Sequence, residues 1–213
     1  MRKSIFKKMA AVTLIAVSFV GCASNEEAYT QSASGNPSGF RDTVWGMSAE
    51  EVNSLETLEL VSNEDNLSVY VYPKEQVTEF EADLISDAND NIALAYIFDY
   101  KPDKESDKYD VDGLYQIMIQ IYFDSEDTRN ADLQNVVDEF NGKYGDSESA
   151  ENGVGVILDD SQKTWKYNEN SYVLVQPIDS DGIYELQVII GSNDYLEALS
   201  EMNKDDLNAI TVN

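Results

Sequence analysis

The chain has 213 residues, of which 41 are acidic, 14 are basic, one is cysteine and none is histidine. A formal charge of −27 argues against nucleic acid as a partner, because nucleic acid is bound chiefly by Lys and Arg side chains that neutralise phosphates. Without histidine, the chain has no imidazole for a catalytic dyad or triad, nor for a zinc, copper or haem site. Its 13 Tyr, 7 Phe and 2 Trp are too many aromatic side chains for a disordered tail, so we expect a folded domain.

Residues 1–21 have the layout of a secretory signal peptide. Basic residues stand at positions 2, 3, 7 and 8, and an apolar run follows from Met9 to Val20. A run of about 12 apolar residues is shorter than the roughly 20 that a membrane-spanning helix needs, so it predicts a signal that is removed. Removal takes those four basic residues and no acidic one, which leaves 10 basic and 41 acidic side chains and a formal charge of −31.

The residues Phe19-Val20-Gly21-Cys22 resemble the lipobox of bacterial lipoproteins, in which a small residue precedes a cysteine that is diacylated and becomes the new N-terminus. The resemblance implies that Cys22, the sole cysteine, carries a lipid anchor that holds the protein at the cell membrane on its extracytoplasmic face. Two acyl chains give stable anchoring, whereas one does not. The alternative is an ordinary secretory signal with an incidental cysteine. In either case a chain with one cysteine has no internal disulfide.

Residues 22–39 are rich in Ser, Asn, Gly, Ala and Glu and have no apolar periodicity, which predicts a flexible tether. Residues 40–213 are expected to form a single domain. No Pro-rich or Gly-rich linker divides this part of the chain.

The start of the first helix is signalled by Ser48 and Glu51. Ser48 can cap the helix, and Glu51, three residues later, can reach back to the Ser48 amide. The pattern predicts a helix over residues 49–58, with Val52 and Leu55 on its buried side.

The remaining apolar patterns predict two groups of strands separated by a helix. In residues 114–123 the apolar side chains alternate with Gln116 and Gln120, the period of two that a half-buried strand shows. The predicted strands cover residues 67–72, 77–85, 92–99 and 114–123 before a helix at 130–144, and 154–158, 164–167, 172–176 and 183–190 after it, with a closing helix at 194–202. This order predicts an α+β fold in which helices back an antiparallel sheet. It also suggests two tandem halves, 40–125 and 126–213, each made of a helix and a meander.

A short sequence at the first helix carries a family resemblance. Gly46-Met47-Ser48-Ala49-Glu50-Glu51-Val52 is similar to the segment that opens a helix in the β-lactamase-inhibitor proteins and in the small lipoproteins of the outer-membrane assembly machinery. The preceding Trp45, and later Lys143-Tyr144-Gly145 and Thr164-Trp165-Lys166, resemble features of uncharacterised exported bacterial proteins of similar layout. The resemblance implies a helix packed on an antiparallel sheet and carries over no activity or partner, because fold does not fix function.

The sequence singles out no catalytic residue and no metal site. Carboxylate pairs like those of glycosidases stay open, with Asp99 at a strand end and Glu185 on a strand as candidates, beside the alternative of solvated surface charge. The acidic loops at 87–91, 107–113 and 179–182 do not match the calcium-binding loop of EF-hands, and turn formation explains them. We therefore expect no cofactor, no metal and no enzymatic activity.

Binding is the function that remains. The aromatic residues Trp45, Tyr115, Trp165 and Tyr172 are candidate partner contacts, because aromatic side chains are enriched at protein interfaces, although core packing is an alternative for each of them. For Trp45 and Trp165 we predict burial in the core or at a junction between helix and sheet. Two hypotheses follow: a lipid-anchored binding or scaffold module for a basic protein or peptide at the cell envelope, and a carboxylate-dependent hydrolase that acts on envelope glycan.

Lipidation of Cys22 can be tested by metabolic labelling. Labelled palmitate should enter the wild-type protein but not Cys22→Ser, because the variant lacks the thiol that receives the acyl chains. The matched control Ser24→Ala should label like the wild type. Equal labelling of Cys22→Ser and wild type, measured on immunoprecipitated protein, would rule out the anchor.

Overall fold

The computed structural model describes residues 31–32, 35–64, 66–72, 92–100, 111–149, 162–180 and 182–198. The predicted signal, Cys22 and the predicted strands at 77–85 and 154–158 lie outside these ranges.

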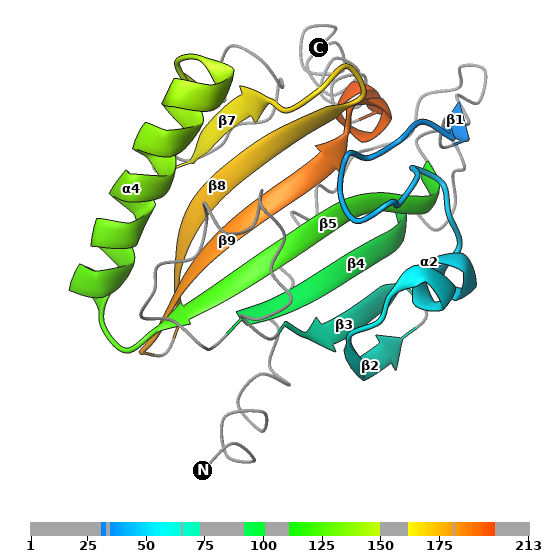
Figure 1. Cartoon of the computed structure of the whole chain (residues 1–213), viewed down its shortest axis with the longest axis horizontal. Helices are drawn as coiled ribbons and strands as arrows, with labels where there is room; N and C mark the ends of the chain where they lie inside the picture. Colours follow the sequence, from blue (N-terminus) through cyan, green and yellow to red (C-terminus); the bar gives the residue numbers. More distant parts are fainter. Residues whose placement is uncertain are drawn as a thin grey trace, which may run out of the picture.

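The described strands form one nine-stranded sheet (Figure 1). Its neighbouring strands are, in order, β2 (Glu59–Glu64), β3 (Leu67–Val71), β4 (Ile92–Tyr100), β5 (Val111–Phe123), β9 (Ile183–Ser192), β8 (Ser171–Ser180), β7 (Lys163–Lys166) and β6 (Glu148–Ser149). All of these neighbours pair antiparallel. The short β1 (Gln31–Ser32) lies off this path and pairs parallel with β5. The predicted α+β class, with helices backing an antiparallel sheet, is confirmed.

Among the described residues, α2 (Ala49–Leu55) is followed by β2 to β5, and α4 (Glu126–Tyr144) is followed by β6 to β9. The last strand of each of these two series lies at the centre of the sheet, where β5 pairs with β9 from Gln116 opposite Gly191 to Phe123 opposite Tyr184. The division into two helix-plus-meander halves, 40–125 and 126–213, stays a prediction.

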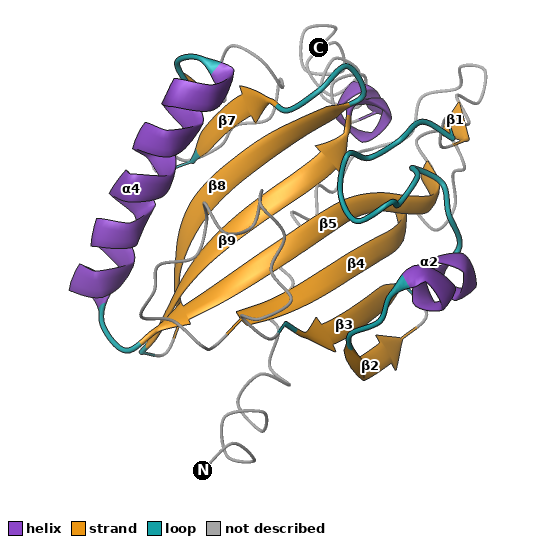
Figure 2. Ribbon diagram, in the orientation of Figure 1, coloured by secondary structure: helices purple, strands orange, loops and turns teal. Residues whose placement is uncertain are grey.

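The helices α2 and α4 pack on the same face of the sheet (Figure 2). Val52 of α2 and Phe140 of α4 are completely buried and belong to one apolar cluster. The cluster takes alternate residues from the two central strands, Ile117, Ile119 and Ile121 of β5 and Leu186, Val188 and Ile190 of β9. Alternation places one set of side chains under the helices and turns the other set to the opposite face.

The opposite face holds a second apolar cluster. Met118 and Ile189 come from the two central strands and pack with Leu174 of β8. Residues 193–198, which are helical, add Ala198 to this cluster, and the predicted closing helix therefore starts where expected, while its remainder lies outside the described residues. Within the described chain, no helix is both long and apolar enough to cross a membrane.

Two expectations about the elements at the β2 edge of the sheet need correction. The sequence reading missed β2, whose side chains are mostly exposed, because an edge strand without a buried face has no apolar alternation to detect. Leu55 is the last residue of α2 and is 47% exposed, so only Val52 of the two expected residues is buried.

α4 begins four residues earlier than predicted. Ser125 caps it by accepting a hydrogen bond from the Thr128 amide, and Glu126 and Asp127 occupy its first turn. The prediction relied on apolar spacing, which starts only at Leu133, so it missed this polar first turn.

The loop before α2 belongs to the folded part. Gly35 N–H donates to the Trp45 carbonyl, and Ser38 is fully buried. Its carbonyl accepts hydrogen bonds from Ser171 Oγ and Asn168 Nδ2, both at 3.0 Å, on the second half of the chain. The predicted tether, 22–39, therefore overlaps the folded part at residues 31–32, which pair with β5, and at residues 35–39.

The capping of α2 gives a stability test. Ser48 and Glu51 form the predicted reciprocal pair, with Glu51 N–H donating to Ser48 Oγ and Ser48 N–H donating to Glu51 Oε2 at 2.8 Å. Ser48→Ala should lower the free energy of unfolding in urea by about 0.5–2 kcal/mol. Ser54→Ala, the same change on the exposed side of this helix, should instead leave it unchanged or raise it slightly, because Ala has the higher helix propensity. Equal losses in both variants would contradict a specific role for the cap.

Candidate functional site

The two tryptophans are core residues, as predicted. Trp45 is 1% exposed and its Nε1 donates to Ser171 Oγ at 3.1 Å, which links the first half of the chain to the second. Trp165 is 3% exposed, donates through Nε1 to Asn141 Oδ1 at 3.0 Å, and meets the Phe140 ring edge to face. Buried indoles with satisfied N–H groups hold the helices on the sheet.

Tyr115 and Tyr172, the two tyrosines among the candidate partner contacts, lie in the apolar cluster on the face opposite α2 and α4. Tyr115 stacks at an angle on Tyr195, with 4.7 Å between ring centroids. Tyr172 lies directly over Gly191, where a Cβ would approach its ring to 2.2 Å, so the ring requires glycine at that position. Burial raises the pKa of Tyr172. Partner contact by these tyrosines and the two tryptophans stays a prediction, and their burial leaves each with little surface to offer.

A polar network crosses the centre of the face opposite the helices. Glutamines from three neighbouring strands, and one from the residue before a fourth strand, form a row across the sheet. Gln120 of β5 stands opposite Gln187 of β9, and Gln187 stands opposite Gln176 of β8. Gln162, immediately before β7, donates through Nε2 to Gln176. Gln176 in turn donates to Gln187 at 2.7 Å. We call these four glutamines and Glu185 the glutamine network.

The hydrogen bonds of the row lead to one carboxylate, that of Glu185. Gln187 Nε2 donates to Glu185 Oε1 at 2.7 Å, and Gln120 Nε2 donates to the same oxygen at 2.8 Å. A chain of hydrogen bonds with one direction is mutually polarising, so the row supports a negative charge on Glu185. Within the described residues, the side-chain oxygens of Gln120 and Gln162 are buried without a hydrogen-bond partner.

Burial opposes that charge. Glu185 is only 8% exposed, and removal from water raises its pKa, although the hydrogen bonds from Gln187 and Gln120 act in the opposite direction. Tyr122 stands opposite Glu185 on β5, and burial together with the Glu185 charge raises the pKa of the Tyr122 phenol. Carboxyl groups with shifted pKa values cluster at functional sites and also occur in structural networks, and a buried carboxyl with a raised pKa can serve as an acid or as an acceptor for a cationic group.

Asp99 and Glu185 do not form a catalytic pair. Phe98 is opposite Leu114, whereas Glu185 is opposite Tyr122, eight positions further along β5. At about 3.3 Å per residue the two carboxyl groups are roughly 25 Å apart, far beyond the about 5–9.5 Å of glycosidase pairs. Asp99 Oδ1 accepts a hydrogen bond from the Gly113 amide at 2.7 Å, which is a structural role at the end of a strand.

Glu56 is a second buried carboxylate, and it forms an ion pair with Arg41. Glu56 accepts two hydrogen bonds from Arg41, at 2.9 and 3.1 Å, and one from the Tyr96 hydroxyl at 2.8 Å. Burial opposes ionisation of Glu56, but the Arg41 and Tyr96 hydrogen bonds and the Arg41 charge outweigh it, so its pKa lies below the ordinary value. This cluster joins the loop before α2 to the sheet and is satisfied internally.

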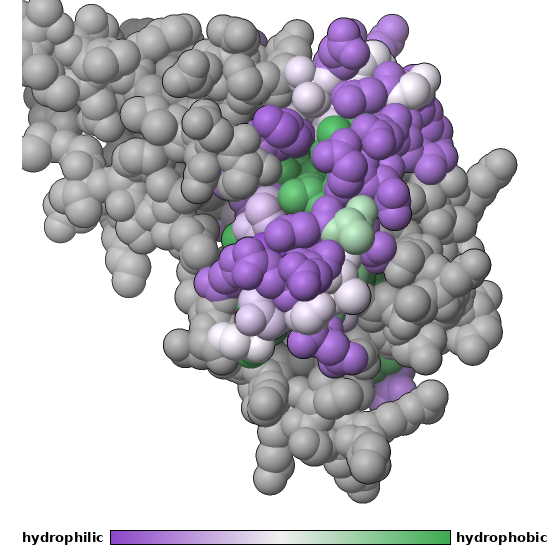
Figure 3. Space-filling view, turned by 90° about the vertical axis from the view of Figure 1, so that its left-hand side faces the viewer, coloured by the Kyte–Doolittle hydropathy of each residue, from purple (hydrophilic) through white to green (hydrophobic). Residues whose placement is uncertain are grey.

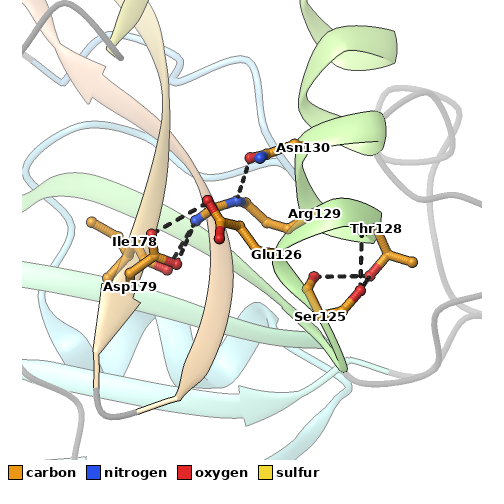
Figure 4. Close-up of polar contacts among 7 residues, drawn as sticks. All are labelled: Ser125, Glu126, Thr128, Arg129, Asn130, Ile178 and Asp179. Carbon is orange, nitrogen blue, oxygen red and sulfur yellow. Dashed lines mark hydrogen bonds and ion pairs between the residues drawn. The ribbon is translucent and has the colours of Figure 1, made fainter.

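A buried arginine fixes the start of α4 to the last residues of β8 (Figure 4). Arg129 Nη1 donates to Asp179 Oδ1 at 2.9 Å and to the Ile178 carbonyl at 3.3 Å, and its Nε donates to Asn130 Oδ1 at 3.0 Å. Glu126 lies 3.9 Å away on the same helix. These contacts use the hydrogen-bond donors of the guanidinium group, so Arg129 has a structural role: it holds the start of α4 against β8.

Acidic side chains dominate the exposed surface. Figure 3, which faces the α4 side of the molecule, shows a largely hydrophilic surface over the described residues. On α4 the exposed charged residues are Glu126, Asp127, Asp138 and Glu139, with Lys143 as the exposed base. Across the described ranges, the only other exposed base is Lys166.

The described residues contain no group of acidic or other ligand side chains that could hold a metal ion. Of the three acidic loops, 87–91 lies outside those residues, and 107–113 and 179–182 are described only in part.

No family model matches the chain, and no curated protein matches it. The lipobox resemblance and the resemblance at Gly46 to Val52 therefore stay predictions.

The glutamine network could be predicted from the sequence only in part. The alternation in β5 assigned Gln120 to the polar face of a half-buried strand, but Gln120 is 2% exposed, so this face is buried at its centre as well. Glu185 and Gln187 alternate in the same way on β9. Polar residues at alternate positions in two strands were the available signal, but only the register brings them together.

The raised pKa of Glu185 predicts a pH-dependent stability effect. A carboxyl whose pKa is higher in the folded state favours folding below its unfolded pKa and loses that contribution as pH rises through the folded pKa. Glu185→Gln should therefore raise the free energy of unfolding at neutral pH and leave it unchanged in acid, where the wild-type carboxyl is protonated. Glu139→Gln on the exposed surface of α4 removes the same charge and is the control. Urea unfolding across pH measures both, and identical profiles for the two variants would contradict the prediction.

Proposed function

We propose that the protein is a lipid-anchored, extracytoplasmic module that binds or scaffolds a basic protein or peptide at the cell envelope. The proposal combines the predicted anchor at Cys22 with the surface of the folded domain. It assigns no cofactor and no catalytic residue.

The observation that carries this proposal is the one-sided charge of the exposed surface. Exposed carboxylates line α4 and recur along the described chain, whereas the exposed bases there are Lys143 and Lys166. Such a surface attracts a basic partner over several ångströms and disfavours an acidic one. Salt screens this attraction over a Debye length of about 8 Å at physiological ionic strength, so encounter with the partner should slow as salt rises.

The alternative is a hydrolase that acts on envelope glycan, and the observation in its favour is the raised pKa of Glu185. A general acid needs such a pKa, but glycoside hydrolysis also needs a second carboxyl group about 5–9.5 Å away. Within the described residues, the side chains that hydrogen-bond to Glu185 are amides, so the binding module is the better-supported function.

Crosslinking on intact cells tests the proposal. A crosslinking chemistry that joins carboxylates of this protein to lysine amines of the partner should capture one basic extracellular partner with the wild-type protein at low salt. A soluble form lacking residues 1–22 should capture less of it, because it is not confined to the membrane. Asp138→Asn with Glu139→Gln should reduce recovery at low salt more than at high salt, whereas Asn135→Gln on the same helix should not.

Two results would overturn the proposal. Capture that is insensitive to salt and to the loss of surface carboxylates would remove the charge argument. Cleavage of purified envelope glycan that is lost in Glu185→Gln would instead establish the hydrolase.

A further inference from the structure

One edge of the sheet carries a concentration of exposed apolar side chains. The exposed large hydrophobic residues of the described chain are Leu55 at 47%, Leu60 at 44% and Val61 at 47%. Leu55 ends α2, and the other two lie in β2, the outermost strand at this edge (Figure 1). Scattered single exposures need no explanation, but these three lie within seven residues of each other at one edge.

The backbone geometry of β2 brings these side chains together. Leu60 stands opposite Tyr70, whose side chain lies in the cluster under the helices, and therefore points to the face on which α2 packs. The register shifts between Leu60 and Ser62, so Val61 has no partner residue on β3. A bulge of this kind places two consecutive side chains against one position of the neighbouring strand.

The two ends of the sheet differ in how they are protected. At the far end, β6 has two residues and β7 has four, and such short strands offer little template for pairing. β2 has six residues, and within the described part of the chain no strand pairs with its outer side, beside which the apolar side chains are exposed. Of the devices that shield sheet edges, β2 has a bulge and a glutamate at each end but no lysine or proline, so its charges disfavour an acidic strand and not a basic one.

The charges at this edge select the partner. Glu59 and Glu64 stand at the two ends of β2 and are exposed, and Glu50 and Glu51 are exposed on the adjoining helix. If two copies paired antiparallel through β2, Glu59 of each would face Glu64 of the other, and like charges directly opposite are destabilising. A strand with a basic residue at each end would convert both repulsions into attractions.

We propose that β2 is a strand-addition site for an extended basic segment of another protein, with Lys or Arg at both ends of a six-residue stretch and β-branched residues between them. Main-chain hydrogen bonds to β2 supply the affinity, and contacts with Leu60 and Val61 fix the register. Extended peptides bind other sheet edges by the same physics. This inference rests on the proposed binding function and specifies the surface and the partner for it.

A defined peptide probe tests the site with the purified full-length protein. The probe is Lys-Val-Thr-Val-Thr-Lys flanked by glycines and labelled for fluorescence anisotropy at low salt. Its affinity should fall about tenfold or more when the backbone nitrogens of its central residues are methylated, because methylation removes main-chain donors and leaves the charges in place. Hydrogen exchange of the β2 amides should slow in the presence of the unmethylated probe.

Matched variants separate pairing from charge. Val61→Lys should weaken binding of the probe about tenfold or more, whereas Ala131→Lys, which adds the same charge on the exposed surface of α4, should change it little. Equal affinity for methylated and unmethylated probes, or equal effects of the two variants, would overturn the strand-addition site. Self-association lost in Val61→Lys would assign the edge to a second copy and also overturn it.

The failure of this inference is distinguishable from failure of the proposed function. A basic partner captured on cells whose crosslinks map to α4, with no protection of β2, would leave the binding module intact and remove only the edge site. Absence of any salt-sensitive partner would remove the binding module itself.

Discussion

The pairing of β5 with β9 is the constraint on which the rest of the architecture depends. These two strands are the last of the series that follow α2 and α4, and their antiparallel register from Gln116 to Phe123 joins the two series into one continuous sheet. Ile119 and Val188, at the middle of the pair, are fully buried beneath the helices. In the described part of the chain α2 and α4 cover the same face, and joining the strands of both series gives one core shared by the two helices.

The same central pair carries the most costly group in the fold. Glu185 is buried on the face opposite the helices, among glutamines that compensate only part of its loss of water. Glu56 shows the alternative solution, since a buried carboxylate with Arg41 beside it has its charge neutralised. Arg41 and Arg129, two of the few basic residues, form ion pairs with other carboxylates. Glu185 instead accepts hydrogen bonds from uncharged glutamine amides. The surface is acidic chiefly because the chain has 41 acidic and 14 basic residues, and the internal placement of Arg41 and Arg129 adds to that imbalance.

Local patterns predicted the elements that have a buried face. The Ser48 and Glu51 cap, and the alternation in β5, are short-range signals, and the structure agrees with both. β2 escaped prediction because its side chains are exposed on both faces, and the start of α4 escaped because its first turn is polar. The glutamine network depends on the register of β5 against β9, and β5 is far along the chain from β8 and β9, which follow one another closely. No property of Gln120 or Glu185 taken alone distinguishes a buried network from solvated surface charge.

The position of β5 and β9 also determines the order in which the domain can assemble. A chain is synthesised from its N-terminus, so residues 116–123 of β5 emerge well before residue 183, where their partner strand begins. Until then β5 is an apolar strand with an open edge, able to pair with the same strand of another nascent molecule. The step that completes the sheet is therefore a long-range closure made only when nearly the whole described chain is available. Premature release of the chain, or cleavage within its second half, would leave a partial sheet in which the apolar strand β5 has an unpaired edge.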